Sequence, residues 1–323
     1  MCDDRDCDQD HDRVDLPAYY AEEIRRRERI ARECPVDVYS SSVNAAWGWP
    51  WKLTSSNERR QTTRKSAGTV MVDPGFRNPA CSPEIAHAAW KVDADYVLMK
   101  DISPEHALHG DAEDRHLVSL DTSANCVDWY RELRAAAENG ETVHVGRWQV
   151  AHSAAPVVPL QPPYAETVAA AAEDRERRGG TVNLLADDDI QYYAAGGLLS
   201  IASVDERIEE LQFLRDALGD AKIHALAPGT NPVMIRALRE NADLVDSLDV
   251  STPENAPANG KLPDVDWKQH KIRMTAGTDS SITRGQYAAG IAVELARQLT
   301  PGKFDRREDV SDCGDAQTEI SAW

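Results

Sequence analysis

The sequence predicts a single-domain (β/α)8 barrel of the TIM type. Short runs rich in β-branched and aromatic residues alternate with longer stretches of helical character, a pattern typical of parallel α/β folds. The 323 residues, 41% of them hydrophobic, are enough for one barrel-sized core. We assign residues 1–34 to an acidic tail and an amino-terminal helix, residues 35–300 to the barrel, and residues 301–323 to a carboxy-terminal tail.

The first elements come before the barrel. The opening MCDDRDCDQDHD is too acidic to pack into a core and is predicted to be disordered. Cys2, Cys7 and His11 leave open a metal site in this tail. A charged amphipathic helix is predicted over residues 16–32.

Seven runs are predicted as strands because each is short, apolar and followed by polar or turn-forming residues. They are residues 36–41, 69–73, 96–101, 157–161, 190–195, 222–227 and 244–249. Residues 142–148 and 117–120 are further candidates. Helices are predicted between them, over residues 83–89, 124–139, 164–178, 204–218, 232–241 and 282–299. Thr122 or Ser123, and Ser203, are candidate N-caps, and Gly140 and Gly219 are candidate stops.

Carboxylates fall at the ends of three of these strands. Asp73 ends VMVD, Asp101 ends YVLMKD and Asp249 ends LVDSLD. Gln161 ends VVPLQ, and Gly196-Gly197 closes IQYYAAGG. The carboxyl ends of barrel strands share one face, where the active sites of such enzymes lie. The alternative for each Asp by itself is a helix cap.

At these residues the sequence resembles the guanine transglycosylases, which exchange guanine for a 7-deazaguanine in nucleic acid. YYAAGGLLS is similar to the motif GYAIGGLAVGE, HALAPGTNP to YLMGVGTPE, and DSLDVSTPENAPANG to DMFDCVLPTRSGRNG. Weaker matches precede them in the same order: VMVDPGF resembles LTDSGGY, DADYVLMKDISP resembles SDIVMAFDECP, and VVPLQ resembles GIVQ. The resemblance implies the TIM-barrel fold.

The resemblance also implies roles for single residues. Asp249 would attack C1′ of the target nucleoside, and Asp73 would act as general acid and base. Asp101 would pair with N1-H and the exocyclic amine of guanine, while Gln161 and the backbone N-H of Gly197 would bind O6. Gly196, Leu198 and Leu226 complete the implied base pocket. A carboxylate nucleophile suits this reaction, because double displacement keeps the sugar attached while bases are exchanged.

Several departures from the family pattern favour DNA over tRNA as the substrate. The zinc motif downstream of the nucleophile is absent, so no cofactor or metal is expected. Two loop arginines of the family are replaced by Asn255 and Ala258, and no appended RNA-binding domain follows. Pro74 replaces a Ser after Asp73, and Pro162 and Pro163 replace a Gly-Gly pair. These features resemble a DNA-modifying branch that installs 7-deazaguanines such as preQ0.

The net charge indicates the salt conditions and the compartment in which the protein is expected to work. The 55 acidic and 36 basic residues give a net charge of -19, which disfavours polyanions at low salt. We interpret it as adaptation to molar salt, where screening acts within about 3 Å, in a halophilic archaeon or its virus. The alternative is an acidic cytosolic enzyme acting on small molecules. Unpaired cysteine spacing and the lack of a signal peptide predict a cytoplasmic protein, in the host cytoplasm if viral.

Candidate nucleic-acid contacts precede the second predicted strand. They are Arg59, Arg60, Arg64 and Lys65 and the aromatic cluster of Trp47, Trp49 and Trp51. A further candidate, Asn255, follows Asp249. An alternative for the tryptophans is a hydrophobic lid on the barrel mouth. The sequence is also compatible with a homodimer.

The leading hypothesis is therefore a DNA guanine transglycosylase. Its alternatives are a tRNA-guanine transglycosylase of the queuosine or archaeosine pathway, another barrel glycosidase or nucleoside hydrolase, and a guanine-binding regulatory subunit.

Overall fold

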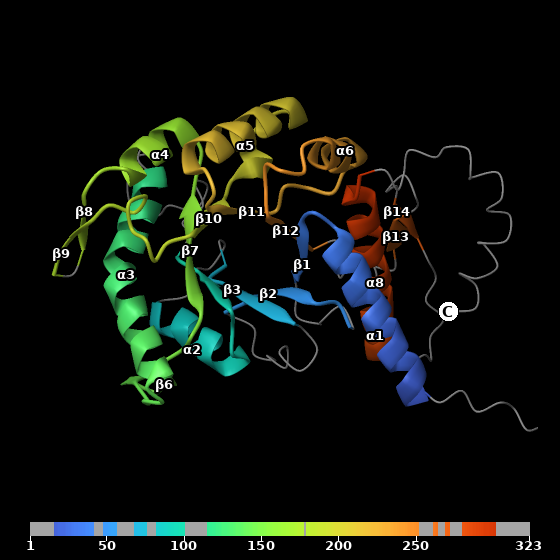
Figure 1. Ribbon diagram of the computed structural model, residues 1–323, viewed down its shortest axis with the longest axis horizontal. Coiled ribbons are helices and arrows are strands. Elements are labelled where there is room, and N and C mark those ends of the chain that lie inside the picture. Colours follow the sequence, from blue (N-terminus) through green and yellow to red (C-terminus); the bar gives the residue numbers. More distant parts are fainter. Residues whose placement is uncertain are drawn as a thin grey trace, which may run out of the picture.

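Eight parallel strands close into a barrel in the order in which they follow one another along the chain (Figure 1). The computed structural model describes residues 16–41, 48–56, 68–75, 82–100, 115–177, 179–251, 261–263, 269–271 and 280–301. The barrel strands are β1 (Asp37–Ser41), β2 (Trp51–Ser55), β3 (Thr69–Asp73), β4 (Tyr96–Leu98), β7 (Ala155–Leu160), β10 (Tyr192–Ala195), β11 (Lys222–Ala225) and β12 (Ser247–Val250). The predicted (β/α)8 fold is confirmed.

Helices join the later strands on the outside of the barrel. They are α2 (Ser82–Val92), α3 (Arg115–Glu138), α4 (Tyr164–Ala171), the short 3-10 helix η3 (Leu198–Ser200), α5 (Val204–Leu218) and α6 (Pro232–Glu240). Three small antiparallel hairpins lie outside the barrel: β5 (His144–Val145) with β6 (Trp148–Gln149), β8 (Arg175–Arg177) with β9 (Gly180–Val182), and β13 (Lys261–Pro263) with β14 (Gln269–Lys271).

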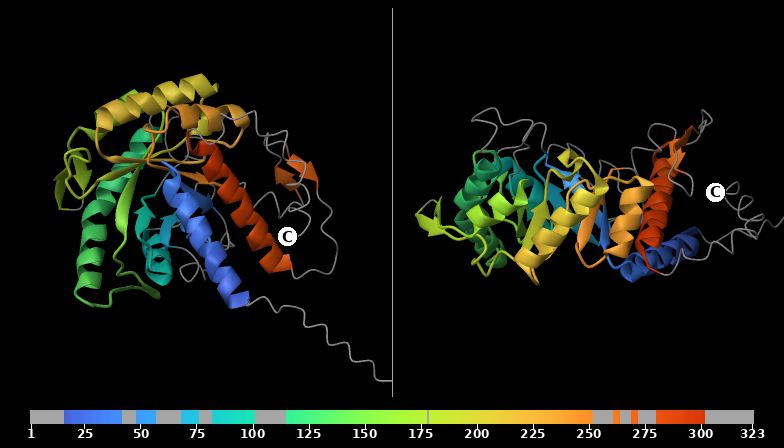
Figure 2. Two further views of the ribbon diagram at one scale, coloured as in Figure 1. Left: turned by 45° about the vertical axis from the view of Figure 1, so that its right-hand side comes forward. Right: turned by 90° about the horizontal axis from the view of Figure 1, so that it is seen from above.

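One side of the barrel is covered by two helices from distant parts of the chain. Helix α1 (Leu16–Glu33) precedes β1, and α8 (Ser280–Leu299) follows the last strand. They lie side by side and both contact β1 (Figures 1 and 2). Within the described residues no helix lies between β1 and β2, so α1 and α8 cover strand surface that a connecting helix would otherwise bury.

Alternation along the strands creates two cores. Side chains facing outward pack against the helices in one large cluster, which includes Val38, Val72, Val97 and Ile223. Those facing inward fill the barrel with Tyr39, Leu53, Met71, Leu98, Val157, Tyr192 and Ala194. The interior of the barrel is therefore packed, as in other TIM barrels, and its chemistry must lie at a rim.

The strand predictions were wrong at three places. β2 was not predicted, because Lys52 and Thr54 make WKLTS look like a surface segment, although both side chains are buried. Residues 117–120 lie inside α3, and residues 142–148 contribute only to the small β5–β6 hairpin. The other strands are confirmed with their ends shifted by a few residues.

The helix predictions were confirmed for α5 and corrected for α3 and α4. Ser203 caps α5, with its hydroxyl accepting the Glu206 N-H at 3.1 Å in a capping box. Thr122 and Ser123 are not caps, because α3 begins at Arg115 and the Thr122 hydroxyl donates to the Val118 carbonyl within the helix. Helix α4 ends at Ala171 rather than at residue 178.

Candidate active site

The carboxyl ends of the barrel strands bring the predicted site residues to one rim. Asp73 is the last residue of β3, and Asp249 is the third residue of β12. Gln161, Gly196 and Leu226 directly follow β7, β10 and β11, respectively. Because all these strands are parallel, the five residues share the end of the barrel at which TIM-barrel enzymes carry their active sites.

Asp249 is a buried carboxylate held by the neighbouring strand segment. Only 7% of its surface is exposed. Its Oδ1 accepts the backbone N-H of Ala227 at 2.6 Å and lies 3.6 Å from Nε2 of His224. A carboxylate fixed in this way loses little freedom on reaction, as a nucleophile requires.

The backbone that supplies this N-H is strained. Ala227 has a φ of 45°, in the left-handed region that residues with a Cβ rarely adopt. Such strain persists only where surrounding contacts hold it, and it concentrates at functional sites. Here it aims a hydrogen-bond donor at the Asp249 carboxylate.

A chain of polar side chains lies beneath Asp249, inside the barrel. Nδ1 of His224 lies 2.6 Å from the Ser247 hydroxyl, which lies 2.5 Å from the Tyr192 hydroxyl. Burial raises the pKa of Tyr192 above its usual value, so this hydroxyl keeps its proton. These three residues occupy adjacent strands, β12, β11 and β10, and fix the ring that faces Asp249.

Sequence reasoning missed this chain, although one signal was available. In a strand, residues two apart share a face, so His224 lies on the same side of β11 as Leu226, which was predicted to line the site. A histidine on an inward-facing position of a barrel strand is expected to have a polar partner.

Gln161 and the Gly196-Gly197 pair form one packed wall of the rim. Gln161 is 1% exposed, and its backbone carbonyl accepts the Thr167 hydroxyl at 2.5 Å. A Cβ at Gly196 would lie 2.2 Å from Nε2 of Gln161. The Tyr164 hydroxyl donates to the carbonyl of Gly196. The glycine is therefore required for the amide to sit against the backbone of β10.

Asp73 sits in a different environment. Its Oδ1 accepts the N-H of Gly75 at 2.8 Å, and its carbonyl accepts the N-H of Ser56 at 2.8 Å. The chain after β3 therefore turns back onto Asp73, with Pro74 at the turn. The side chain is half-buried, so it is more accessible to solvent than Asp249.

The two leucines of the predicted base pocket differ. Leu226 is half-buried and packs against the cluster inside the barrel. The Leu198 side chain is fully buried in the outer core, which leaves only its backbone for a ligand. Other predicted residues lie outside the described residues: Asp101, Arg59, Arg60, Arg64, Lys65, Trp47 and Asn255.

The lid hypothesis is wrong for the two described tryptophans, and burial excludes base contact for Trp49. Trp49 is 1% exposed and donates its indole N-H to the Val38 carbonyl at 2.7 Å. Trp51 begins β2, at the opposite end of the barrel from the rim, and contacts Trp49 edge to face. Neither ring therefore covers the mouth of the barrel, and the Trp49 ring is too deeply buried to contact a base.

Comparisons with known proteins add little to this geometry. No known protein family matches the sequence, and neither does any curated protein. Among solved structures, one match is a Coccidioides immitis protein described as a fructose-1,6-biphosphate aldolase, with a TM-score of 0.43 and 14% identity. The match covers 88% of this chain and 96% of the other.

Two further features bear on the predicted cofactors and partners. In the described part of the chain, no three His, Cys, Asp or Glu side chains are grouped so as to hold a metal ion, and Cys2, Cys7 and His11 lie outside it. A search of the same residues finds no helix with the length and hydropathy of a membrane span. The chain is thus a TIM barrel with a polar rim around a buried aspartate.

Proposed function

We propose that the chain is a DNA guanine transglycosylase that exchanges guanine for a 7-deazaguanine such as preQ0, with Asp249 as the covalent nucleophile. The observation that carries this proposal is the Asp249 carboxylate, buried at the rim and held through Oδ1 by the Ala227 N-H. The same rim carries Gln161 and Gly197, which suit O6 of a guanine.

The reaction needs two displacements at C1′. Asp249 attacks C1′ of the target nucleotide, the bond to guanine N9 breaks, and the leaving base takes a proton from Asp73. The incoming 7-deazaguanine gives a proton to Asp73 and attacks C1′, which releases the Asp249 carboxylate. Each displacement inverts C1′, so the product retains its configuration.

Base recognition follows from the donors and acceptors of guanine. The side-chain N-H of Gln161 and the backbone N-H of Gly197 donate to O6, while Asp101 accepts N1-H and the exocyclic amine. Adenine offers no matching pair of donors to Asp101, and leaving this carboxylate unpaired against a bound base would cost roughly a few kcal/mol. The target base must leave the stack to enter such a site.

Backbone conformation supports the family assignment. Gly197 has a φ of 67°, at the second glycine of the Gly-Gly pair in the motif GYAIGGLAVGE. Ala227 has a φ of 45° where the motif YLMGVGTPE has a glycine. A strained alanine at a motif glycine is expected if the loop keeps the geometry of the family after the glycine is lost.

The finer assignment rests on the sequence. Missing family features favour DNA, with tRNA as the alternative, and the charge of -19 favours activity at high salt, in the cytoplasm of a halophile or of a virus-infected host. Another barrel glycosidase or nucleoside hydrolase would use the same buried carboxylate without exchanging bases. No metal has a role in the proposed reaction.

Incorporation of labelled guanine separates these possibilities. The protein is incubated at high salt with labelled guanine and either duplex DNA or tRNA. We expect label in DNA only. Label in tRNA alone would replace DNA by tRNA, and release of free base without incorporation would indicate a hydrolase.

Trapping tests the nucleophile. Asp249→Asn should abolish the covalent adduct with nucleic acid, seen on a denaturing gel, while leaving guanine binding in place. The matched control is Asp246→Asn, because Asp246 precedes β12 and its carboxylate accepts the Ile223 N-H at 2.8 Å, away from the rim. An adduct that persists in Asp249→Asn would exclude Asp249 as the nucleophile.

A further inference from the structure

Helix α5 carries a buried arginine, Arg207, in its first turn, at the rim of the barrel. Arg207 shares the buried face of the helix with Leu211 and Leu214, at a position where the helical pattern leads one to expect an apolar side chain. Only 9% of its surface is exposed. Its hydrogen bonds go to backbone carbonyls, and no carboxylate among the described residues pairs with it.

The guanidinium of Arg207 bridges two loops that leave neighbouring strands. Nε and Nη2 donate to the carbonyl of Ile201 at 3.1 Å and 3.0 Å, in the loop after β10. Nη1 donates to the carbonyl of Pro228 at 3.4 Å, in the loop after β11. Because β10 and β11 pair in the barrel, one side chain ties two adjacent loops of the rim together.

The loop after β10 contains Gly197, the residue proposed to donate to O6 of guanine. Gly197 caps the short helix η3, and the chain leaves this helix at Ile201. The N-H of Ser200 donates to the Gly197 carbonyl at 2.8 Å, and the N-H of Ile201 donates to the Leu198 carbonyl at 3.2 Å. Arg207 therefore holds the far end of the same turn that begins at Gly197.

The loop after β11 contains Ala227, whose N-H bonds to Asp249 at 2.6 Å. Pro228 lies between Ala227, with a φ of 45°, and Gly229, with a φ of 94°. A hydrogen bond to the Pro228 carbonyl restrains the backbone between two residues in the left-handed region. It is therefore one of the contacts that keep the strained turn in place.

The two loops also touch each other directly. A Cβ built at Gly229 would lie 3.5 Å from Cδ2 of Leu199 and 3.8 Å from Nη1 of Arg207. The Leu199 side chain thus reaches the loop after β11, although 59% of its surface is exposed. The loops share an apolar contact and a guanidinium, and only the guanidinium fixes their orientation through hydrogen bonds.

We propose that Arg207 is a positioning residue that couples the base-binding loop at Gly197 to the loop at Ala227 that holds the nucleophile. A buried cation that meets only neutral carbonyls adds little to stability, because lost hydration offsets much of the gain. The planar fork of donors instead holds two carbonyls at a fixed separation, which an apolar side chain cannot do. The coupling stands by itself, but its consequence for catalysis rests on the proposed function.

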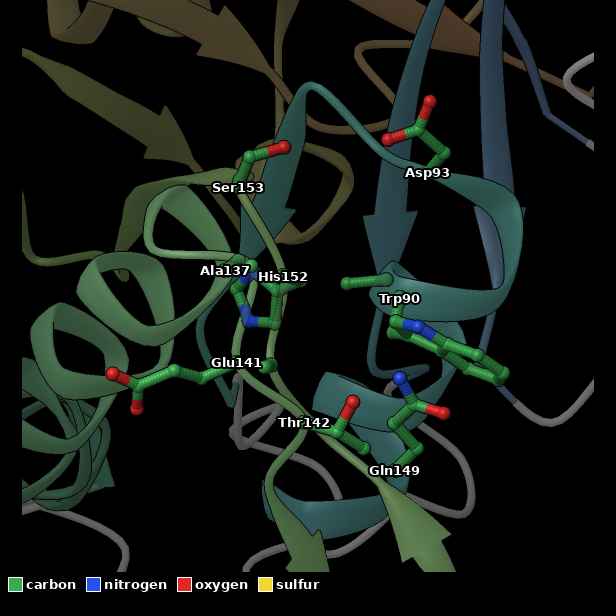
Figure 3. Close-up of a pocket in the computed structure, with 11 residues that line it drawn as sticks. Trp90, Asp93, Ala137, Glu141, Thr142, Gln149, His152 and Ser153 are labelled. Carbon is green, nitrogen blue, oxygen red and sulfur yellow. The ribbon is translucent and has the colours of Figure 1, made fainter.

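Amide hydrogen exchange followed by NMR tests the coupling without any substrate. In Arg207→Met, an unbranched side chain without donors, the amides of Ser200 and Ala227 should both exchange about tenfold faster or more. The reference is the Val150 amide, which donates to the Val143 carbonyl at 2.9 Å, next to the residues that line the cavity between α2 and α3 (Figure 3). Its exchange should not change.

Arg215→Met is the matched control. Arg215 lies on the same helix but at the opposite end of the barrel, where Nη1 donates to the carbonyls of Gly219 and Ala221 at 3.0 Å and 2.8 Å. This variant should leave the two rim amides, of Ser200 and Ala227, as they are. Arg207→Lys has one ammonium in place of a fork, so it can hold only one loop and at least one rim amide should exchange faster. It decides the question if Arg207→Met does not fold.

Guanine exchange supplies the second readout. Arg207→Met should raise KM for guanine and lower kcat, each about tenfold, because the O6 donor and the nucleophile both lose support. A merely structural role would lower kcat through loss of folded protein and leave KM unchanged. If the unaltered protein exchanges no guanine, the proposed function fails, while hydrogen exchange still decides the role of Arg207.

Three results would overturn the inference about Arg207. The first is rim amides that exchange no faster in Arg207→Met than in Arg215→Met. The second is a change in only one of the two rim amides of Arg207→Met, because the loops would then not be coupled. The third is an active Arg207→Met with an unchanged KM for guanine.

Discussion

The wall formed by Gln161 and Gly197 allows the effect of close packing to be separated from that of backbone conformation. In Gly197→Ala, the new Cβ would lie 2.7 Å from Cδ of Pro162 and 2.8 Å from Oε1 of Gln161. Real Cβ atoms do not approach so closely, and the proline ring cannot turn aside. Forcing a methyl group into a packed site costs about 1–3 kcal/mol. The φ of 67° adds about 1–2 kcal/mol for an L-residue. The expected total is therefore roughly 2–5 kcal/mol.

Gly140→Ala is the matched control for Gly197→Ala. Gly140 has a φ of 71°, and a Cβ added there would meet nothing within 4 Å. This variant should lose only the conformational part, about 1–2 kcal/mol. The assay is urea denaturation at fixed salt, with the free energy of unfolding compared between the two variants and the unaltered protein.

The difference between the two variants reports the packing against Gln161 and Pro162. An equal loss in the free energy of unfolding for Gly197→Ala and Gly140→Ala would refute the reasoning, because it would mean that Gln161 and Pro162 accommodate the added methyl group at no energetic cost. Gly196→Ala adds a second readout. It pushes the flexible end of Gln161 aside, so it should weaken guanine binding while changing the free energy of unfolding less than Gly197→Ala does.

Three further predictions concern stability. Folding lowers the pKa of His152 from 6.5 to about 4, so between these pH values the folded state binds fewer protons than the unfolded state. The free energy of unfolding should therefore fall by on the order of 3 kcal/mol as the pH drops from 6.5 to 4. Urea denaturation of His152→Phe should lack this pH-dependent loss. Ser203→Ala removes the cap of α5 and should cost about 1 kcal/mol in urea denaturation, and no loss would argue against the cap. Trp49→Phe leaves the buried Val38 carbonyl without its indole donor and should cost about 1–3 kcal/mol, more than the same change at the half-buried Trp51.

Much of the barrel could be predicted because its strands are apolar runs that end in polar residues. β3 was predicted to the residue, and Ser203 and Gly219 marked both ends of α5. β2 was not predicted, because the buried side chains of Lys52 and Thr54 face the outer core, where sequence patterns lead one to expect apolar residues. Only the closed barrel makes that position identifiable.

The errors in the helices have tertiary causes. The predicted extension of α4 instead forms a hairpin that lies against α3, where Arg175 bonds to Asp121 at 2.7 Å and Arg177 bonds to Asp128 at 2.7 Å. Residues distant in sequence supply these contacts, so local propensity cannot reveal them.

The candidate site was predicted unevenly for a related reason. Asp249, Gln161 and Gly196 could be placed at the rim because Asp249 lies one residue before the end of β12, and Gln161 and Gly196 directly follow β7 and β10. His224 and the strained backbone at Ala227 depend on which strands are neighbours in the closed barrel. A single sequence does not specify that arrangement.

The arrangement of α1 and α8 has a consequence for biosynthesis. β1 is the first barrel strand to leave the ribosome, but it pairs with β12, the last barrel strand. Helix α8, which packs against β1, is translated later still. A nascent polypeptide must therefore hold β1 with an open hydrogen-bonding edge until nearly all the barrel has been made. Asp249, His224, Ser247 and Tyr192, which are carried by the last three strands, can come together only in that final stage, so the polar rim is completed when synthesis is nearly finished.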